Sequence, residues 1–190
     1  MPDFLPEAIT PPFAHSFAVI EPGRTLEFGD SALVYPYMSV TKMFSVWAML
    51  VAVDRALIGL DDEVEIADGQ RVVTLRHLLA HASGLAFNGP VLEAEVEEKR
   101  IYSNRGFEEA SWAIEEATGF DFPDWVEATV FESLGLVETE LEGSAAHAGV
   151  GSLRDLIALA HELIEPELIS PELAKEAQQV VYPGLKGLTP

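Results

Sequence analysis

The chain has 190 residues and a mass of 20.7 kDa, a size that predicts a single domain. Its 11 basic and 32 acidic residues give a formal net charge of −21, which argues against binding to nucleic-acid phosphates or to anionic lipid at a membrane. The absence of cysteine excludes disulfide scaffolds, thiolate metal sites and cysteine nucleophiles. A hydrophobic content of 48% predicts a folded chain.

The first elements predicted are extended. Residues 1–10 are acidic and contain two prolines, so they lack the features of a secretory signal, and we expect a cytoplasmic protein. Residues 17–20 and 25–28 predict a hairpin around the turn at Pro22-Gly23, and residues 32–37 predict a further extended stretch. We expect these strands to form one sheet.

Helices follow. The apolar run 43–53 predicts a buried helix that is too short to span a bilayer. Further helices are predicted over residues 74–81 before Gly84, 107–118 before Gly119, 122–133 before Gly135, 152–165 from a Ser152–Asp155 capping box, and 170 to about 181. Strands first and helices after predict the α+β class, with sheet strands in 13–38 and a helical region in 39–182.

Ser39 and Lys42 form the first candidate site. They lie three residues apart at the start of the predicted buried helix, so their side chains can meet on one face. A serine hydroxyl becomes nucleophilic when a base takes its proton, and a desolvated lysine can be that base or keep a second base anionic. The helix N-terminus adds positive potential for an oxyanion. A helix cap followed by a surface lysine has the same spacing, so the motif alone leaves both interpretations open.

Tyr102, Ser103 and Asn104 form the second candidate, on a loop before the helix predicted over 107–118. A phenol titrates near pH 10, but an ammonium about 4 Å away contributes about 4 kcal/mol at an effective dielectric constant near 20. Lys42 could therefore make Tyr102 a usable base, with Asn104 contacting the substrate amide or Lys42. An ordinary turn with Asn104 capping the next helix explains the same residues.

Four segments, in chain order, are similar to signature segments of the β-lactamase and penicillin-binding-protein superfamily, with the class C related serine hydrolases as the nearest likeness. They are residues 38–42, 73–85, 102–104 and 149–156, within a match from about residue 17 to residue 159. The resemblance implies a β-lactamase/transpeptidase-like α+β fold, in which helices flank an antiparallel sheet.

The same resemblance implies roles for the candidate residues. Ser39 is then the acylated nucleophile, and Lys42 is its activating partner. Tyr102 is the general base, and Asn104 contacts the substrate and Lys42. The implied chemistry is hydrolysis of a small-molecule amide or ester through an acyl-Ser39 intermediate, of β-lactamase, DD-peptidase or esterase type. It implies no cofactor and no metal, and the expected cytoplasmic location favours an esterase or small-amide hydrolase.

One departure from the family concerns its third motif, a Lys or His followed by a small residue and Gly on a late strand. His147-Ala148-Gly149 has the letters but precedes the capped helix, so we interpret it as unrelated. We therefore expect residues 1–190 to be a single, incomplete domain without the C-terminal strands and closing helix. Activity would need a C-terminal companion fragment or a strand-sharing homodimer. The alternative is an inactive N-terminal fragment or a non-catalytic binding domain that needs a second chain.

His77 and His81 have the spacing of a two-histidine metal pair on one helix face. Leu78 stands where a zinc-binding His-Glu-x-x-His motif has its glutamate, and no third ligand is evident. The sequence therefore predicts structural roles for both histidines.

Overall fold

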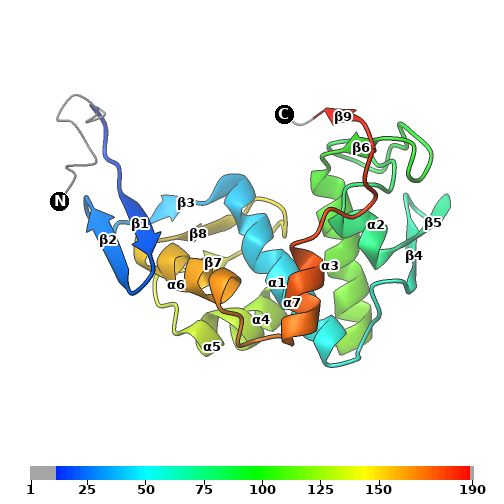
Figure 1. Cartoon of the computed structure of the whole chain (residues 1–190). Helices are drawn as coiled ribbons and strands as arrows, with labels where there is room; N and C mark the ends of the chain where they lie inside the picture. Colours follow the sequence, from blue (N-terminus) through cyan, green and yellow to red (C-terminus); the bar gives the residue numbers. More distant parts are fainter. Residues whose placement is uncertain (1–11, 189–190) are drawn as a thin grey trace.

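The computed structural model describes residues 12–188 as an α+β fold (Figure 1). The first part of the chain contains β1 (Phe17–Glu21), β2 (Arg24–Phe28), β3 (Tyr35–Pro36), the 3₁₀ helix η2 (Met38–Val40), α1 (Thr41–Asp54), β4 (Glu63–Ile66), β5 (Arg71–Thr74), α2 (Leu75–Leu79) and β6 (Arg100–Ile101). The second part contains α3 (Asn104–Thr118), α4 (Phe122–Val126), the π-helical turn η3 (Glu127–Phe131), α5 (Glu132–Leu134), β7 (Glu140–Leu141), β8 (Gly149–Gly151), α6 (Leu153–Ile164), α7 (Pro171–Ala177) and β9 (Gly187–Leu188).

Helix α1 forms the centre of the core, as its apolar sequence predicts. A helix that is apolar on nearly all sides has to be buried, and α1 packs against α3 and α4. Two indole N–H groups find partners there. Trp47 donates to the buried carboxylate of Glu162 on α6 at 2.8 Å, and Trp125 of α4 donates to the Ala48 carbonyl oxygen at 2.9 Å. These bonds fix α1 between helices from distant parts of the chain.

The N-terminal hairpin is confirmed, but the expected single sheet is wrong. β1 and β2 pair antiparallel from Phe17–Phe28 to Glu21–Arg24, whereas β3 joins β8 and β7 in a separate sheet of order β3-β8-β7. Between β2 and β3 the chain turns, and the Asp30 carboxylate accepts the Ala32 N–H at 3.1 Å in this turn. β3 then pairs antiparallel with β8.

The helical region predicted over 39–182 also contains strands, which is a second correction. β4 and β5 form a hairpin within it, and β6, β7 and β8 lie there as well. Glutamate and apolar residues alternate along β4, a pattern typical of a strand with one buried face. In the structure Val64 and Ile66 are buried, while Glu63 and Glu65 are exposed. The strands β6, β7 and β8 are only two or three residues long.

The predicted helices are present with shifted ends. α2 stops at Leu79 rather than residue 81, α3 starts at Asn104 rather than residue 107, and α7 stops at Ala177 rather than near residue 181. The helix predicted over 122–133 is interrupted by the π turn η3. The capping box at Ser152 is half formed, because the Asp155 carboxylate binds the Glu138 N–H and the Thr139 hydroxyl instead.

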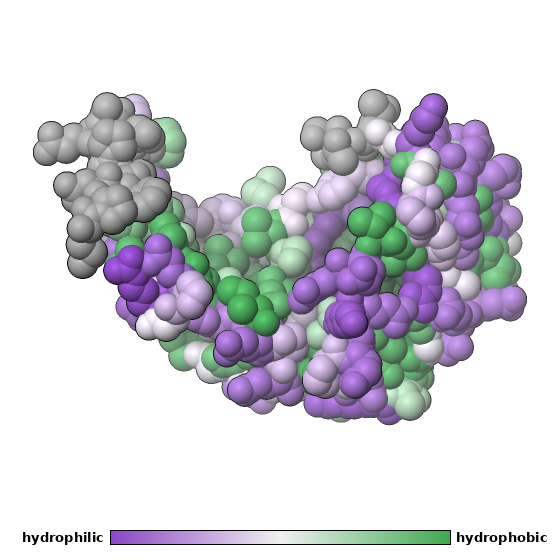
Figure 2. Space-filling view, viewed as in Figure 1, coloured by the Kyte–Doolittle hydropathy of each residue, from purple (hydrophilic) through white to green (hydrophobic). Residues whose placement is uncertain are grey.

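The molecule has a broad concave surface between the β1–β2 hairpin and the α2–α3 end, with hydrophobic residues along its floor (Figure 2). Val34, just before β3, and Met38 and Val40 of η2 have exposed apolar side chains. Among the helices described between residues 12 and 188, none is long and apolar enough to cross a membrane.

Candidate active site

Ser39 is held at a sharp turn between β3 and α1. Tyr37, just before it, donates its N–H to the Gly149 carbonyl oxygen of β8 at 2.8 Å, which fastens this turn to the sheet. Met38 has a φ of +50°, in the left-handed region that non-glycine residues rarely adopt. Such strain persists only where surrounding contacts enforce it, and it is common at functional sites. The turn leaves Ser39 exposed to solvent at the N-terminal end of α1.

Lys42 lies one turn further along and is only 5% exposed. Its Nζ donates to Oδ1 of Asn104 at 2.6 Å and to the Ala146 carbonyl oxygen at 3.0 Å. The same ammonium lies 4.6 Å from the ring centre of Tyr102 and 5.5 Å from that of Phe107. Lys42 is therefore a buried cation held by hydrogen bonds and by two aromatic faces, and not a surface lysine.

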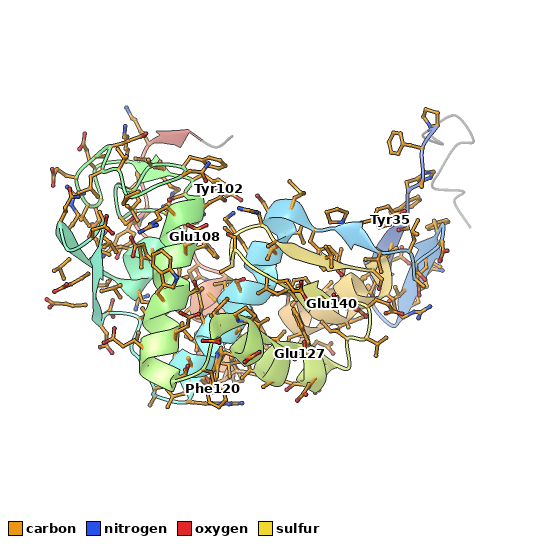
Figure 3. All side chains as sticks on the ribbon, turned by 180° about the vertical axis from the view of Figure 1, so that it is seen from behind. Tyr35, Tyr102, Glu108, Phe120, Glu127 and Glu140 are labelled. Atoms are coloured by element: carbon orange, nitrogen blue, oxygen red, sulfur yellow. The ribbon has the colours of Figure 1, made fainter. Side chains whose placement is uncertain are left out.

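Tyr102 and Asn104 are positioned by the cap of α3. The hydroxyl of Ser103 accepts the Gly106 N–H at 2.9 Å and donates to the Ala86 carbonyl oxygen at 2.6 Å, which joins the start of α3 to the loop after α2. Figure 3 shows Tyr102 at this end of α3, the end nearer to η2. Tyr102 comes directly before the capping residue Ser103, and Asn104 comes directly after it as the first residue of α3. The cap therefore fixes the backbone that carries both side chains.

The two tyrosines near Ser39 differ in acidity. Burial raises the pKa of Tyr37 to about 12, and its hydroxyl donates to the Ser152 carbonyl oxygen at 2.8 Å. Burial also acts to raise the pKa of Tyr102, but the interactions of its hydroxyl with Ser39 and Lys42, and the charge of Lys42, outweigh it and hold that pKa below the ordinary value. Of these two phenols, only Tyr102 is suited to give up a proton.

The structure brings the four predicted residues Ser39, Lys42, Tyr102 and Asn104 together. In chemical terms they form an exposed hydroxyl, a phenol of lowered pKa that interacts with it, a buried ammonium that favours the phenolate, and an amide that holds the ammonium. A hydroxyl beside such a base can lose its proton as it attacks a carbonyl carbon. Ser39 lies just before the N-terminal end of α1, and the positive potential of a helix N-terminus stabilises negative charge that develops there.

Residues missed by the sequence analysis complete this arrangement. Asn88 accepts a hydrogen bond from the side-chain N–H of Asn104 at 3.2 Å, which turns Oδ1 of Asn104 toward Lys42. Ala146 contributes only a backbone oxygen, which leaves no signal in a sequence. The turn residues Gly89 and Pro90 mark the Asn88 segment as a loop, but no local pattern singles out Asn88 itself.

The two histidines of the α2 region do not form a metal pair. Nδ1 of His77 accepts the Thr74 N–H at 3.0 Å and its Nε2 lies 3.0 Å from Glu97. Nδ1 of His81 instead accepts the Ser103 N–H at 3.2 Å. Between residues 12 and 188 there is no group of three or more histidine, aspartate or glutamate side chains arranged to hold a metal ion.

The His147-Ala148-Gly149 segment leads into strand β8 rather than into a helix. Gly149 donates its N–H to the Thr41 hydroxyl at 3.0 Å, and a Cβ at this position would lie 2.9 Å from that oxygen. Glycine is therefore required by the close approach of β8 to the start of α1. This packing also places the Ala146 carbonyl oxygen against Lys42.

A family profile, a curated protein and solved structures match most of this chain. The profile of the Beta-lactamase family matches residues 16–177. Penicillin-binding protein 4* of Bacillus subtilis is 23% identical over 211 aligned residues, which cover 92% of this chain and 45% of that protein. A beta-lactamase structure from Mycobacterium bovis superposes with a TM-score of 0.83 at 34% identity, over 90% of this chain and 62% of that one.

Less similar structures share the fold. The D-amino acid amidase of Ochrobactrum anthropi gives a TM-score of 0.75 at 19% identity, over 85% of this chain and 67% of that one. The chain therefore spans less than half of the Bacillus protein and less than two thirds of the mycobacterial one.

Proposed function

The chain belongs to the Beta-lactamase family, and from that premise we propose that it is a serine hydrolase in which Ser39 is acylated by an amide or ester and released by water. The observation that carries this proposal is the meeting of the Ser39 hydroxyl, the Tyr102 phenol and the Lys42 ammonium at one point. A cap and a surface lysine would not need a buried ammonium bonded to Asn104.

The proposed acylation follows from the lowered pKa of Tyr102. The Tyr102 phenolate, stabilised by the Lys42 ammonium, takes the proton from Ser39 as its Oγ forms a bond to the substrate carbonyl carbon. The negative charge that develops on the carbonyl oxygen is stabilised at the N-terminal end of α1. When the bond to the leaving amine or alcohol breaks, the Tyr102 hydroxyl returns the proton to it, which leaves acyl-Ser39 and a regenerated phenolate.

Deacylation repeats these steps with water. The Tyr102 phenolate takes a proton from a water molecule as the water oxygen attacks the acyl carbon. The Tyr102 hydroxyl then returns this proton to Ser39 Oγ as the carboxylic acid leaves. Asn104 has one side-chain N–H bonded to Asn88, and its second N–H is the group we assign to the substrate carbonyl.

We propose a small amide or ester as the substrate class. The names of the similar proteins support this range, since they include a penicillin-binding protein, a D-amino acid amidase and a hydrolase with promiscuous acyltransferase activity. No cofactor takes part in the proposed reaction, because each proton transfer has a side chain or water as its partner.

Intact-protein mass spectrometry after reaction with benzylpenicillin and, separately, p-nitrophenyl butyrate tests this function. We expect a covalent adduct that peptide mapping places on Ser39 and that Ser39→Ala abolishes. Ser133→Ala, at an exposed serine on α5, is the matched control and should keep the adduct. An adduct that persists in Ser39→Ala would refute the assignment of the nucleophile.

A second candidate is a scaffold that acts only with another polypeptide, either a C-terminal companion fragment or a second copy. The observation in its favour is the edge of β1, which within residues 12–188 pairs only with β2 and carries exposed Val19. Native mass spectrometry of the acylated sample distinguishes the two candidates. Full acylation of a single 20.7 kDa species excludes the scaffold, whereas acylation confined to an assembly supports it.

A further inference from the structure

His81 contacts the backbone on both sides of Tyr102. The chain leaves α2 at Leu79, and His81 adopts a φ of +56° that directs it back toward β6. Its carbonyl oxygen accepts the Ile101 N–H at 3.0 Å, and its Nδ1 accepts the Ser103 N–H at 3.2 Å. One residue thus holds the amide before Tyr102 and the amide after it.

The imidazole of His81 also supports the Tyr102 ring. The two ring centres lie 4.7 Å apart at 44°, and the imidazole lies 5.5 Å from the ring of Phe107. These are the same two aromatic rings that the Lys42 ammonium contacts. Ring and backbone contacts together restrict both the position and the tilt of the phenol.

The hydrogen bond from Ser103 requires a neutral imidazole, because a protonated Nδ1 cannot accept it. The charged groups facing His81 are Lys42 of α1 and Arg100 of β6, and both are cationic. Burial, Lys42 and Arg100 lower the pKa of His81 to about 4. His81 is therefore neutral near pH 7 and its Nδ1 is available as an acceptor.

His77, which lies on α2, provides a comparison. Its Nδ1 also accepts a backbone N–H, but from Thr74, the N-cap of α2 itself. His77 therefore closes its own helix, whereas His81 joins the end of α2 to the segment that carries Tyr102. The sequence predicted structural roles for both histidines, but it did not distinguish the N-terminal cap formed by His77 from the link that His81 makes to the Tyr102 segment.

We propose that His81 is a positioning residue, which clamps the backbone on both sides of Tyr102 and thereby holds the phenol against Ser39 and Lys42. The inference rests on the proposed function, since it assigns His81 a part in the same reaction through Tyr102. His81 does not exchange a proton with the substrate in this role.

Two substitutions separate the clamp from backbone strain. His81→Gly and His81→Asn both accommodate the positive φ, but only Asn keeps an acceptor near the position of Nδ1. Acylation by p-nitrophenyl butyrate is measured as the burst of p-nitrophenol over a range of ester concentrations. We expect His81→Gly to lower the acylation rate constant about 10- to 100-fold with little change in the apparent dissociation constant, because misplaced reacting groups lose rate rather than binding.

The conservative and control variants make the result specific. His81→Asn should retain the acylation rate within about threefold, and His77→Ala should retain it even if its unfolding temperature falls. Introduced into Tyr102→Phe, His81→Gly should cause no further loss, because the group it positions is already gone. Equal losses in His81→Gly and His81→Asn, or an undiminished loss in the Tyr102→Phe background, would overturn the proposal.

A titration that needs no substrate keeps the clamp distinguishable from the proposed function. The difference in tyrosinate absorbance between each protein and its Tyr102→Phe counterpart follows the Tyr102 phenol alone. We expect its pKa to rise in His81→Gly and to stay low in His81→Asn. A wild-type chain that forms no adduct with either probe refutes the hydrolase function, while an unchanged phenol titration in a folded His81→Gly refutes the clamp.

Discussion

Acidification should destabilise the fold through His81 in a defined window. The pKa of this imidazole is lowered to about 4 by burial and by the cations Lys42 and Arg100, against 6.5 in the unfolded chain. The unfolded chain binds a proton at His81 at a higher pH than the folded chain does. The contribution of His81 to the free energy of unfolding is therefore fully present above about pH 6.5 and is lost progressively as the pH falls toward 4. At about 1.36 kcal/mol per pKa unit, the whole window corresponds to roughly 3 kcal/mol.

Urea unfolding at pH 7.0 and pH 4.5 measures this loss, with fluorescence of the buried tryptophans as the signal. Many carboxylates also titrate in this range, so the comparison that isolates His81 is with His81→Asn, which has no proton to bind. We expect the wild-type protein to lose about 2 to 3 kcal/mol more than His81→Asn between the two pH values. Equal losses in the two proteins would refute the reasoning, because His81 would then have the same pKa in both states.

Three further substitutions address the site and the core. Tyr102→Phe should slow acylation or deacylation by about 10² to 10⁴ in the p-nitrophenol assay without changing the unfolding temperature, and unchanged turnover would contradict its role as base. Asn88→Ala should slow acylation about fivefold, because the Asn104 amide loses the partner that orients it and a hydrogen bond contributes about 1 kcal/mol. Glu162→Leu should lower the free energy of unfolding by about 1 to 3 kcal/mol in urea, since it leaves the buried Trp47 indole N–H without an acceptor and removes the acceptor of the backbone N–H groups of Glu167 and Leu168 nearer the surface; no measurable loss would show that water replaces the carboxylate.

Local signals in the sequence identified most helices but few of the strand pairings. Thr74 as an N-cap and Gly119 as a left-handed C-cap act within one turn of the chain, so their effects can be read from neighbouring residues. β3, β7 and β8 are each only two or three residues long, and β3 pairs with β8 across more than 100 residues, as in the pairing of Tyr35 with Gly151. No local pattern encodes such a pairing.

The candidate site divides in the same way. The spacing of Ser39 and Lys42 follows from helix geometry, so their proximity could be predicted from the residues alone. The approach of Tyr102 and Asn104 to Lys42 came from the resemblance to a family, because no periodicity relates positions so far apart. The Ala146 carbonyl oxygen and the clamp at His81 consist of backbone hydrogen bonds and ring contacts, which depend on the folded chain rather than on residue type.

The hydrogen bonds of Lys42 have a consequence for how the protein folds. Its two partners, Asn104 and Ala146, lie 62 and 104 residues further along the chain. Contacts of such high sequence separation require the closure of long loops and tend to form late, after local helices. During refolding from urea, the helical signal should therefore recover before the capacity for acylation does. The reactivity of Ser39 is then a probe for the last step of folding, when the three distant segments converge on one ammonium group.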